Sequence, residues 1–204
     1  MYMETAFLIV ILIFSVIIHE IAHGAVAYQL GDDTAKMMGR LTLNPIVHLD
    51  LIGSVILPAL LIFSGAGFVF GWAKPVPVNP SKLRDPKFGS LKVSAAGPIS
   101  NLIVAIFFGL VLRFAPATIF VPGLVEVFSF IVYINILLAV FNLLPIPPLD
   151  GSHILFDLFP NRNLEIFLRQ FGLFILLFVI FFAWPYLSLV VNTIFSLITG
   201  FSLF

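Results

Sequence analysis

Residues 19–23 read His19-Glu20-Ile21-Ala22-His23 and lie inside an apolar run that extends from Ala6 to about Leu30. On an α-helix, residues four apart are rotated by only about 40°, so both imidazoles face the same side, one turn apart. This spacing offers two nitrogens to one metal ion, with the neighbouring glutamate available as a base. The stretch therefore predicts a metal site on a helix.

The alternative interpretation is a pair of core histidines with a surface glutamate between them. The thirteen residues from Ala6 to Ile18 carry no charge, which is typical of a membrane-spanning helix. An ionisable side chain in such a helix costs about 2.5–3.5 kcal/mol, so three within five residues need a shared partner. A metal ion supplies that partner, and we therefore favour the metal site.

The composition is that of a polytopic membrane protein embedded in a lipid bilayer. Of 204 residues, 61% are hydrophobic and only 10% are charged, whereas a soluble domain carries about a quarter charged residues. The formal net charge is zero, so no nucleic-acid partner is expected, and without cysteine any zinc must use histidine and carboxylate ligands. No Lys or Arg precedes the first apolar run, so a cleaved signal peptide is not expected.

The apolar segments predict an all-α fold with about five to six transmembrane helices in a single domain over residues 1–204. We expect these helices at about 5–30, 91–112, 124–144, 164–183 and 186–204, with Gly31 ending the first. Residues 51–72 carry no charge but contain four glycines and a proline. They are expected either to span the bilayer or to form a re-entrant hairpin, which we favour.

Two short segments are predicted to be strands of a small β-element. Thr42 alternates with leucines between Leu41 and Pro45, and the prolines of the Lys74–Pro80 segment require extended backbone. Those prolines remove N–H donors from one edge, whereas Val76 and Val78 keep theirs on the other. The second segment is therefore predicted to be an edge strand that could pair with a substrate backbone, or else a structural loop strand.

Two histidines leave a catalytic zinc one protein ligand short, and Asp150 is the best candidate. It follows three prolines that unwind the end of an apolar helix, where backbone is tolerated only beside protein or a water-filled cavity. The alternative is an interfacial aspartate that caps the next helix. Glu126, His48 and His153 remain other candidate ligands, and we interpret both histidines as interfacial or as supporting residues around the site.

The depth of these residues favours the re-entrant hairpin. His19 and His23 lie near the end of the first helix, and Asp150 follows the fourth apolar segment, so both must reach the same side of the bilayer. With a hairpin at 51–72, nine basic residues share one side and Arg113 alone lies on the other; the nine are Lys36, Arg40, Lys74, Lys82, Arg84, Lys87, Lys92, Arg162 and Arg169. By the positive-inside rule, we expect a multi-pass cell-membrane protein with its site near the cytoplasmic face.

Three motifs together resemble the site-2 protease family of intramembrane zinc metalloproteases, peptidase family M50. They are residues 19–23, Ala96-Gly97-Pro98-Ile99-Ser100-Asn101, and the segment from Asn142 to Gly151, which reads Asn-Leu-Leu-Pro-Ile-Pro-Pro-Leu-Asp-Gly. The chain is similar to the small prokaryotic members that carry no PDZ or CBS domain. The resemblance covers nearly the whole chain up to Asp150, which suggests a catalytic core at 1–151 and a C-terminal helical hairpin at 152–204.

The resemblance implies a role for each matching residue. His19, His23 and Asp150 would bind one Zn²⁺ per chain, and Glu20 would be the general base. Asn142 would lie close to the zinc and help to bind the substrate backbone or the oxyanion.

The expected function is zinc-dependent intramembrane proteolysis. The enzyme would hydrolyse peptide bonds within or near transmembrane segments of substrate proteins, as in regulated intramembrane proteolysis. One alternative is a membrane metal transporter, which needs histidine and aspartate at membrane depth but no glutamate beside the first histidine. The other is a pseudoprotease that binds membrane helices without cutting them. The sequence carries no signal for oligomeric state.

Overall fold

The computed structural model describes residues 2–64, 71–115 and 123–202. Within these ranges four helices are long and apolar enough to cross a membrane: α1 (Tyr2–Gln29), α4 (Gly89–Phe114), α5 (Leu124–Asn142) and α7 (Arg162–Phe182). Each lies where the sequence predicted a spanning helix.

Shorter helices complete the described part of the chain. They are α2 (Thr34–Met37), a 3-10 turn (Pro45–His48), a π-helical turn (Leu51–Ile56), α3 (Leu57–Phe63), a second 3-10 turn (Pro80–Lys82), α6 (Asp150–Leu158) and α8 (Trp184–Thr199). The prediction of an all-α membrane protein is confirmed. The count of five to six spans is not, because α3 and α8 are shorter than a spanning helix needs to be.

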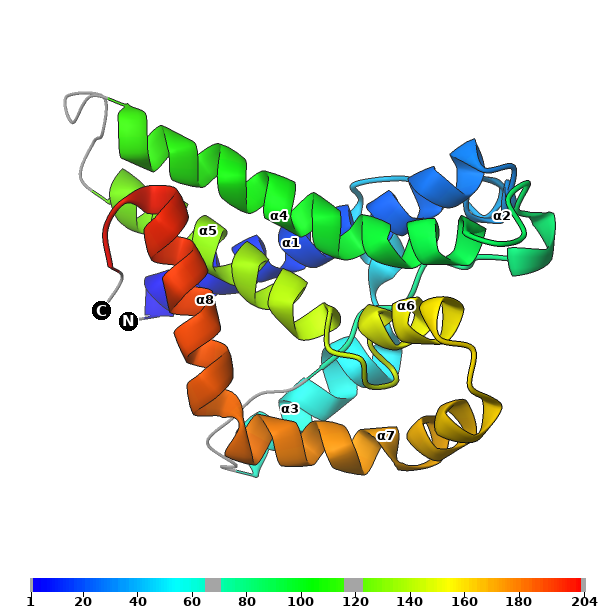
Figure 1. Ribbon diagram of the computed structural model, residues 1–204. Coiled ribbons are helices and arrows are strands. Elements are labelled where there is room, and N and C mark those ends of the chain that lie inside the picture. Colours follow the sequence, from blue (N-terminus) through cyan, green and yellow to red (C-terminus); the bar gives the residue numbers. More distant parts are fainter. Residues whose placement is uncertain (1, 65–70, 116–122, 203–204) are drawn as a thin grey trace.

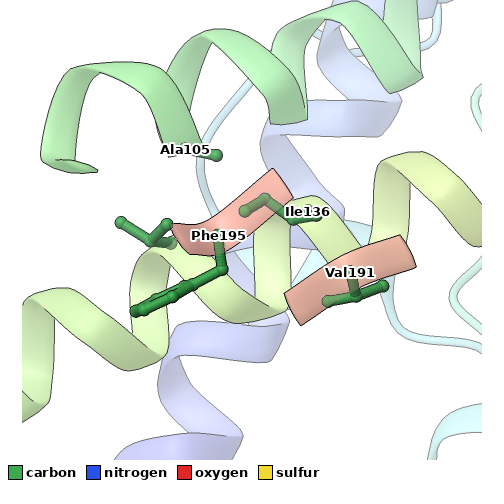
Figure 2. Packing of buried hydrophobic residues seen from close by; sticks show 5 residues of the cluster. Ala105, Ile136, Val191 and Phe195 are labelled. Atoms are coloured by element: carbon green, nitrogen blue, oxygen red, sulfur yellow. The ribbon is translucent and has the colours of Figure 1, made fainter. Parts of the chain in front are cut away.

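The centre of the bundle is α4, which packs against α1, α5, α6 and α8 (Figure 1). Figure 2 shows where α4, α5 and α8 meet. Five fully buried side chains fill this contact: Ala105, Val132, Ile136, Val191 and Phe195. Two of them come from α8, so the C-terminal helix is part of the core.

The α7 helix lies along one edge of the molecule (Figure 1). Its Leu176 packs against Ile146 and Leu149 of the α5–α6 connection in a second buried cluster. The rest of its surface is mostly exposed and rich in phenylalanine, as expected for a helix that faces lipid.

Gly31 ends α1, as predicted. Its φ of +107° is a conformation that side chains with a Cβ rarely adopt. A Cβ there would also lie 3.0 Å from the side chain of Arg84. The Arg84 N–H donates to the Leu30 carbonyl at 2.8 Å, so residues after 80 return to the end of α1.

The predicted β-element is not confirmed, since no residue of the three described ranges lies in a strand. Residues 71–79 carry no helix and run along α1, and the amides of Val76 and Asn79 bond to side chains rather than to another strand. The Val76 N–H donates to the Glu20 carboxylate at 2.8 Å, and the Asn79 N–H donates to Asp32 at 2.6 Å. Leu41–Pro45 leads instead into the 3-10 turn, which Asn44 caps.

The two ends of the 51–72 segment lie side by side. The Trp72 N–H donates to the Gly53 carbonyl at 3.1 Å, and the Lys74 N–H donates to the His48 carbonyl at 2.8 Å. The segment therefore leaves and returns at one place; its residues 65–70 lie outside the described ranges.

Asp32 fastens residues 71–84 to the end of α1. Its fully buried carboxylate accepts from both the N–H and the hydroxyl of Thr34 and from the Asn79 N–H. Burial acts to raise the pKa of Asp32, but these hydrogen bonds, with Lys82 nearby, outweigh it and hold the pKa below its ordinary value. The ionised form is therefore the one that secures the segment.

We expect Asp32→Asn to loosen residues 71–84, with a local opening free energy lower by about 1–3 kcal/mol, because charged acceptors make the stronger hydrogen bonds. In the parent chain the depressed pKa stabilises the fold above about pH 4, the unfolded value. That contribution is lost as the pH falls through the folded value. Amide hydrogen exchange of residues 71–84 in detergent measures both effects.

The matched control is Asp33→Asn, which removes only the partly exposed ion pair to Lys82. Surface pairs contribute little, so this variant should exchange nearly as the parent does. Equal loosening by both substitutions would contradict the role given to Asp32.

Candidate metal centre

The α1 helix presents both histidines to α4. His19 and His23 are 6% and 8% exposed, and their rings meet edge to face with centroids 4.7 Å apart. The Nδ1 atom of His23 lies 2.7 Å from the Val93 carbonyl oxygen, and that of His19 lies 2.7 Å from Oδ1 of Asn101. Both Nε2 atoms are thus left to face a common point.

The proline-broken connection after α5 brings Asp150 to this point as the first residue of α6. The chain reverses so tightly that a Cβ on Gly151 would lie 2.3 Å from the Leu143 carbonyl oxygen. Ile146 and Leu149 are buried against α7 and hold the connection in place. The sequence prediction that Asp150 reaches the depth of the histidines agrees with this geometry.

The three ligand atoms are spaced as for one metal ion. Oδ2 of Asp150 lies 3.0 Å from Nε2 of His19 and 3.3 Å from Nε2 of His23, and the two Nε2 atoms are 3.1 Å apart. A tetrahedral zinc ion with bonds of 2.0–2.1 Å to nitrogen places its ligands about 3.3 Å from one another. The group can therefore hold a metal ion.

The chemistry of the three atoms also fits a cation. A backbone carbonyl only accepts, so His23 carries its proton on Nδ1, and its Nε2 presents a lone pair. His19 does the same if Asn101 presents its oxygen. Oδ2 of Asp150 is buried and has no hydrogen-bond partner among the described residues. Three acceptors thus converge without a donor between them.

Gly97 of α4 leaves the room that an ion needs. A Cβ at this position would lie 2.4 Å from Nε2 of His23 and 2.6 Å from Nε2 of His19. A side chain there would occupy the space in which a metal must approach both nitrogens. The His₂Asp set with an open position is typical of a catalytic rather than a structural zinc site.

Glu20 projects from α1 beside the histidines and is partly buried. Its Oε2 accepts the Val76 N–H at 2.8 Å, which leaves Oε1 without that restraint. The Val76 side chain is buried over Gly24, where a Cβ would lie 2.8 Å from it. The amide predicted to be a free strand edge is thus bonded to the predicted base.

The other sequence candidates lie elsewhere. Asn142 ends α5 and donates to the Leu138 carbonyl at 2.9 Å, within its own helix. Glu126 is exposed in the first turn of α5, and His153 is exposed on α6. His48 is 2% exposed, and its Nε2 lies 2.9 Å from the Thr42 carbonyl oxygen. The group able to hold a metal contains none of these four residues.

Sequence reasoning missed two features of the site. Gly97 was quoted only as part of a motif, although its lack of a side chain leaves room beside the histidines. Asn135, which is fully buried in α5, was assigned no role from the sequence. A polar residue at membrane depth is a signal of function in general, and that signal could have drawn attention to Asn135.

Comparisons with known proteins agree on one family. The sequence profile of peptidase family M50 matches residues 115–183, which include Asp150. A Bacillus subtilis protein named "Putative zinc metalloprotease YwhC" is 48% identical over 160 residues, 76% of this chain and 69% of the relative. The chain belongs to peptidase family M50, the site-2 protease family.

More distant relatives of this M50 chain carry similar names. "Putative zinc metalloprotease Rip2" of Mycolicibacterium smegmatis is 36% identical over 141 residues, 67% of this chain and 51% of the relative. "Putative zinc metalloprotease MJ0611" of Methanocaldococcus jannaschii is 43% identical over 65 residues, about a third of each protein. No solved structure is found to match. With four apolar helices among its described residues, the chain is a multi-pass membrane metalloprotease of this family.

We expect Gly97→Ala to abolish high-affinity metal binding by the M50 chain. The methyl group would lie closer to both Nε2 atoms than any normal contact allows. Zinc content after purification, together with competition against a chelating dye, measures the loss.

The matched control is Gly109→Ala on the same helix. Its Cβ would meet the side chain of Ile198, 2.4 Å away and remote from the histidines. This variant is expected to lose stability but to retain its metal. Retention of full metal affinity by Gly97→Ala would contradict the geometry described above.

Proposed function

We propose that the chain is a zinc-dependent intramembrane protease that hydrolyses peptide bonds within or near transmembrane segments of other proteins. The observation that carries this proposal is the meeting of His19, His23 and Asp150 with Glu20 beside them. The family and the names of the relatives support hydrolysis. The position of the histidines within a spanning helix supports a membrane substrate.

One Zn²⁺ per chain would be held by Nε2 of His19, Nε2 of His23 and Oδ2 of Asp150. When bound, zinc supplies Lewis-acid chemistry: it makes water nucleophilic at neutral pH and polarises a carbonyl. The side chain of Asp150 is 19% exposed, although its ligand atom Oδ2 is buried.

Glu20 would move the proton. As water attacks the scissile carbonyl carbon, Oε1 of Glu20 accepts a proton from it; when the C–N bond breaks, the same oxygen returns the proton to the leaving amine. The products are a carboxylic acid and an amine, so all atoms are accounted for. The Val76 N–H, bonded to Oε2, would restrain the carboxylate while Oε1 accepts and returns the proton.

Asn142 would assist at the substrate. Its Nδ2 has one hydrogen beyond that given to the Leu138 carbonyl, and its amide oxygen is available as an acceptor. Either atom could bind a substrate backbone or stabilise the oxyanion.

The position of the site in the membrane follows from the connection between α1 and α4. Residues 51–63 form at most about 20 Å of helix, less than the roughly 30 Å of a bilayer core. Because the ends of the 51–72 segment meet at Gly53 and Trp72, we propose a re-entrant hairpin. The metal centre then lies near the cytoplasmic face, with nine of the ten basic residues on that side.

We also propose that the whole chain acts as one domain. Residues 1–151 supply the catalytic groups, and the hairpin at 152–204 contributes Val191 and Phe195 to the core and Leu176 to the support of the Asp150 connection.

We expect Glu20→Gln to lower cleavage of a transmembrane substrate by about 10²–10⁴-fold while zinc remains bound. Glutamine can still accept the Val76 N–H, so the surrounding structure should be unchanged. Purified protein in detergent, a fluorogenic transmembrane peptide and metal analysis give the measurement. Glu126→Gln, at the far end of α5, is the control and should leave both activity and zinc unchanged.

The same assay separates the other functions. If the parent chain binds metal and moves it across vesicle membranes without cutting any peptide, it is a transporter. If it binds the peptide without cutting, it is a pseudoprotease. Full activity in Glu20→Gln would refute the proposed base.

For the proposed topology, we expect single cysteines at Lys36 and Lys87 to react with a membrane-impermeant thiol reagent from the same side of the bilayer. A cysteine at Arg113 should react only from the other side. The chain has no native cysteine, so each label reports one position. Labelling of Lys36→Cys and Lys87→Cys from opposite sides would contradict the re-entrant hairpin.

A further inference from the structure

A network of buried polar side chains, which we call the amide network, extends from His19 into the helix bundle, away from the metal centre. Asn101 of α4 and Asn135 of α5 are fully buried, and Ser15 of α1 is 4% exposed. At membrane depth, buried polar groups are costly unless each finds a partner.

Asn101 joins His19 to the rest of the amide network. Its Oδ1 lies 2.7 Å from Nδ1 of His19. Its Nδ2 donates to Oδ1 of Asn135 at 2.8 Å and to the Ser15 carbonyl at 3.2 Å. Both amide hydrogens of Asn101 are therefore used.

Asn135 is held in turn by α1 and by its own helix. Its Nδ2 donates to the Ser15 hydroxyl at 2.9 Å and to the Ile131 carbonyl at 2.8 Å. Both hydrogens of this amide are used as well, and its oxygen receives the Asn101 donor.

Two backbone carbonyls fix the orientation of the side-chain amides in this network. The carbonyls of Ser15 and Ile131 only accept, so each needs an amide nitrogen facing it. Reversing Asn101 would place its oxygen against the Ser15 carbonyl and against Oδ1 of Asn135. Reversing Asn135 as well would place an oxygen against the Ile131 carbonyl. The amide oxygen of Asn101 must therefore face His19.

We propose that Asn135, with Ser15, is a positioning residue for the metal centre. By orienting Asn101, it keeps the proton of His19 on Nδ1, so that Nε2 is always the free nitrogen facing His23 and Asp150. This inference rests on the metal site of the proposed function and extends it to a residue in no contact with the ligand atoms.

His23 supplies an internal comparison. Its Nδ1 faces the Val93 carbonyl directly, and a backbone carbonyl cannot reverse. His23 therefore needs no side-chain network to orient its partner, and a change at Asn135 should affect His19 alone.

The test uses Asn135→Leu in the full chain, purified in detergent and loaded with Zn²⁺ or Co²⁺. Zinc affinity by chelator competition should fall by about 10-fold, the lower end of what changes around metal-bound histidines cost. In the Co²⁺ protein, the two imidazole Nδ1–H protons give separate, paramagnetically shifted NMR signals. The His19 signal should exchange faster with solvent or vanish, while the His23 signal persists.

Three further variants separate orientation from general packing. Asn192→Leu makes the same chemical change on α8, outside the amide network. It should leave the zinc affinity and both N–H signals unchanged. Ser15→Ala, the mildest change, should lower affinity by about threefold, the size of one net hydrogen bond. It carries the test if Asn135→Leu does not fold.

Asn101→Asp gives the rescue. A carboxylate accepts from His19 with either oxygen, so it needs no partner to orient it. Its other oxygen faces the Ser15 carbonyl, which makes this background less stable with or without Asn135→Leu. In the Asn101→Asp background, Asn135→Leu should cause no further loss of zinc affinity. A loss of packing alone would lower affinity equally in both backgrounds.

The inference is overturned if Asn135→Leu, or Ser15→Ala in its place, keeps parental zinc affinity and both N–H signals. It is also overturned if the two signals change together. A parent chain that binds zinc but cleaves nothing would refute the proposed protease and leave this inference standing. A parent chain that binds no divalent metal would refute both.

Discussion

The convergence of two imidazole nitrogens and one carboxylate oxygen on a single point is the interaction on which the rest of the structure depends. Three acceptors within about 3 Å of one another repel unless a cation lies between them. The surrounding chain is arranged to make that meeting possible. One helix, α4, supplies the open space at Gly97 and partners for both histidines, and the buried contacts of α7 hold the connection that carries Asp150.

The same need to satisfy polar groups explains the segment that returns from residue 71 to the end of α1. Two of its amides, those of Val76 and Asn79, bond to Glu20 and Asp32 instead of to a strand. The proposed base and the segment beside it therefore share one hydrogen bond. A substrate backbone that paired with the Val76 amide would compete for it with Glu20, so substrate pairing and the freedom of the base are linked.

Features set by neighbouring residues could be predicted from the sequence, whereas the packing of one helix or segment against a distant one could not. The i, i+4 histidines, the glycine stop at residue 31 and the apolar spans each depend on a few neighbouring residues. Asp150 could be chosen because so few charged residues lie at membrane depth. The role of Gly97 depends on the register of α4 against α1, which composition does not encode. The β-element was predicted from prolines, but the carboxylates that bond to two of its amides lie 56 and 47 residues away along the chain.

The order in which the ligands appear along the chain has a consequence for biosynthesis. Asp150 follows His23 by 127 residues, so the histidine pair enters the bilayer long before its carboxylate partner has been translated. A ribosome-bound fragment that ends before α6 carries only an incomplete, weakly chelating pair. On the proposed function, peptidase competence would thus be acquired only after residue 150 has been translated.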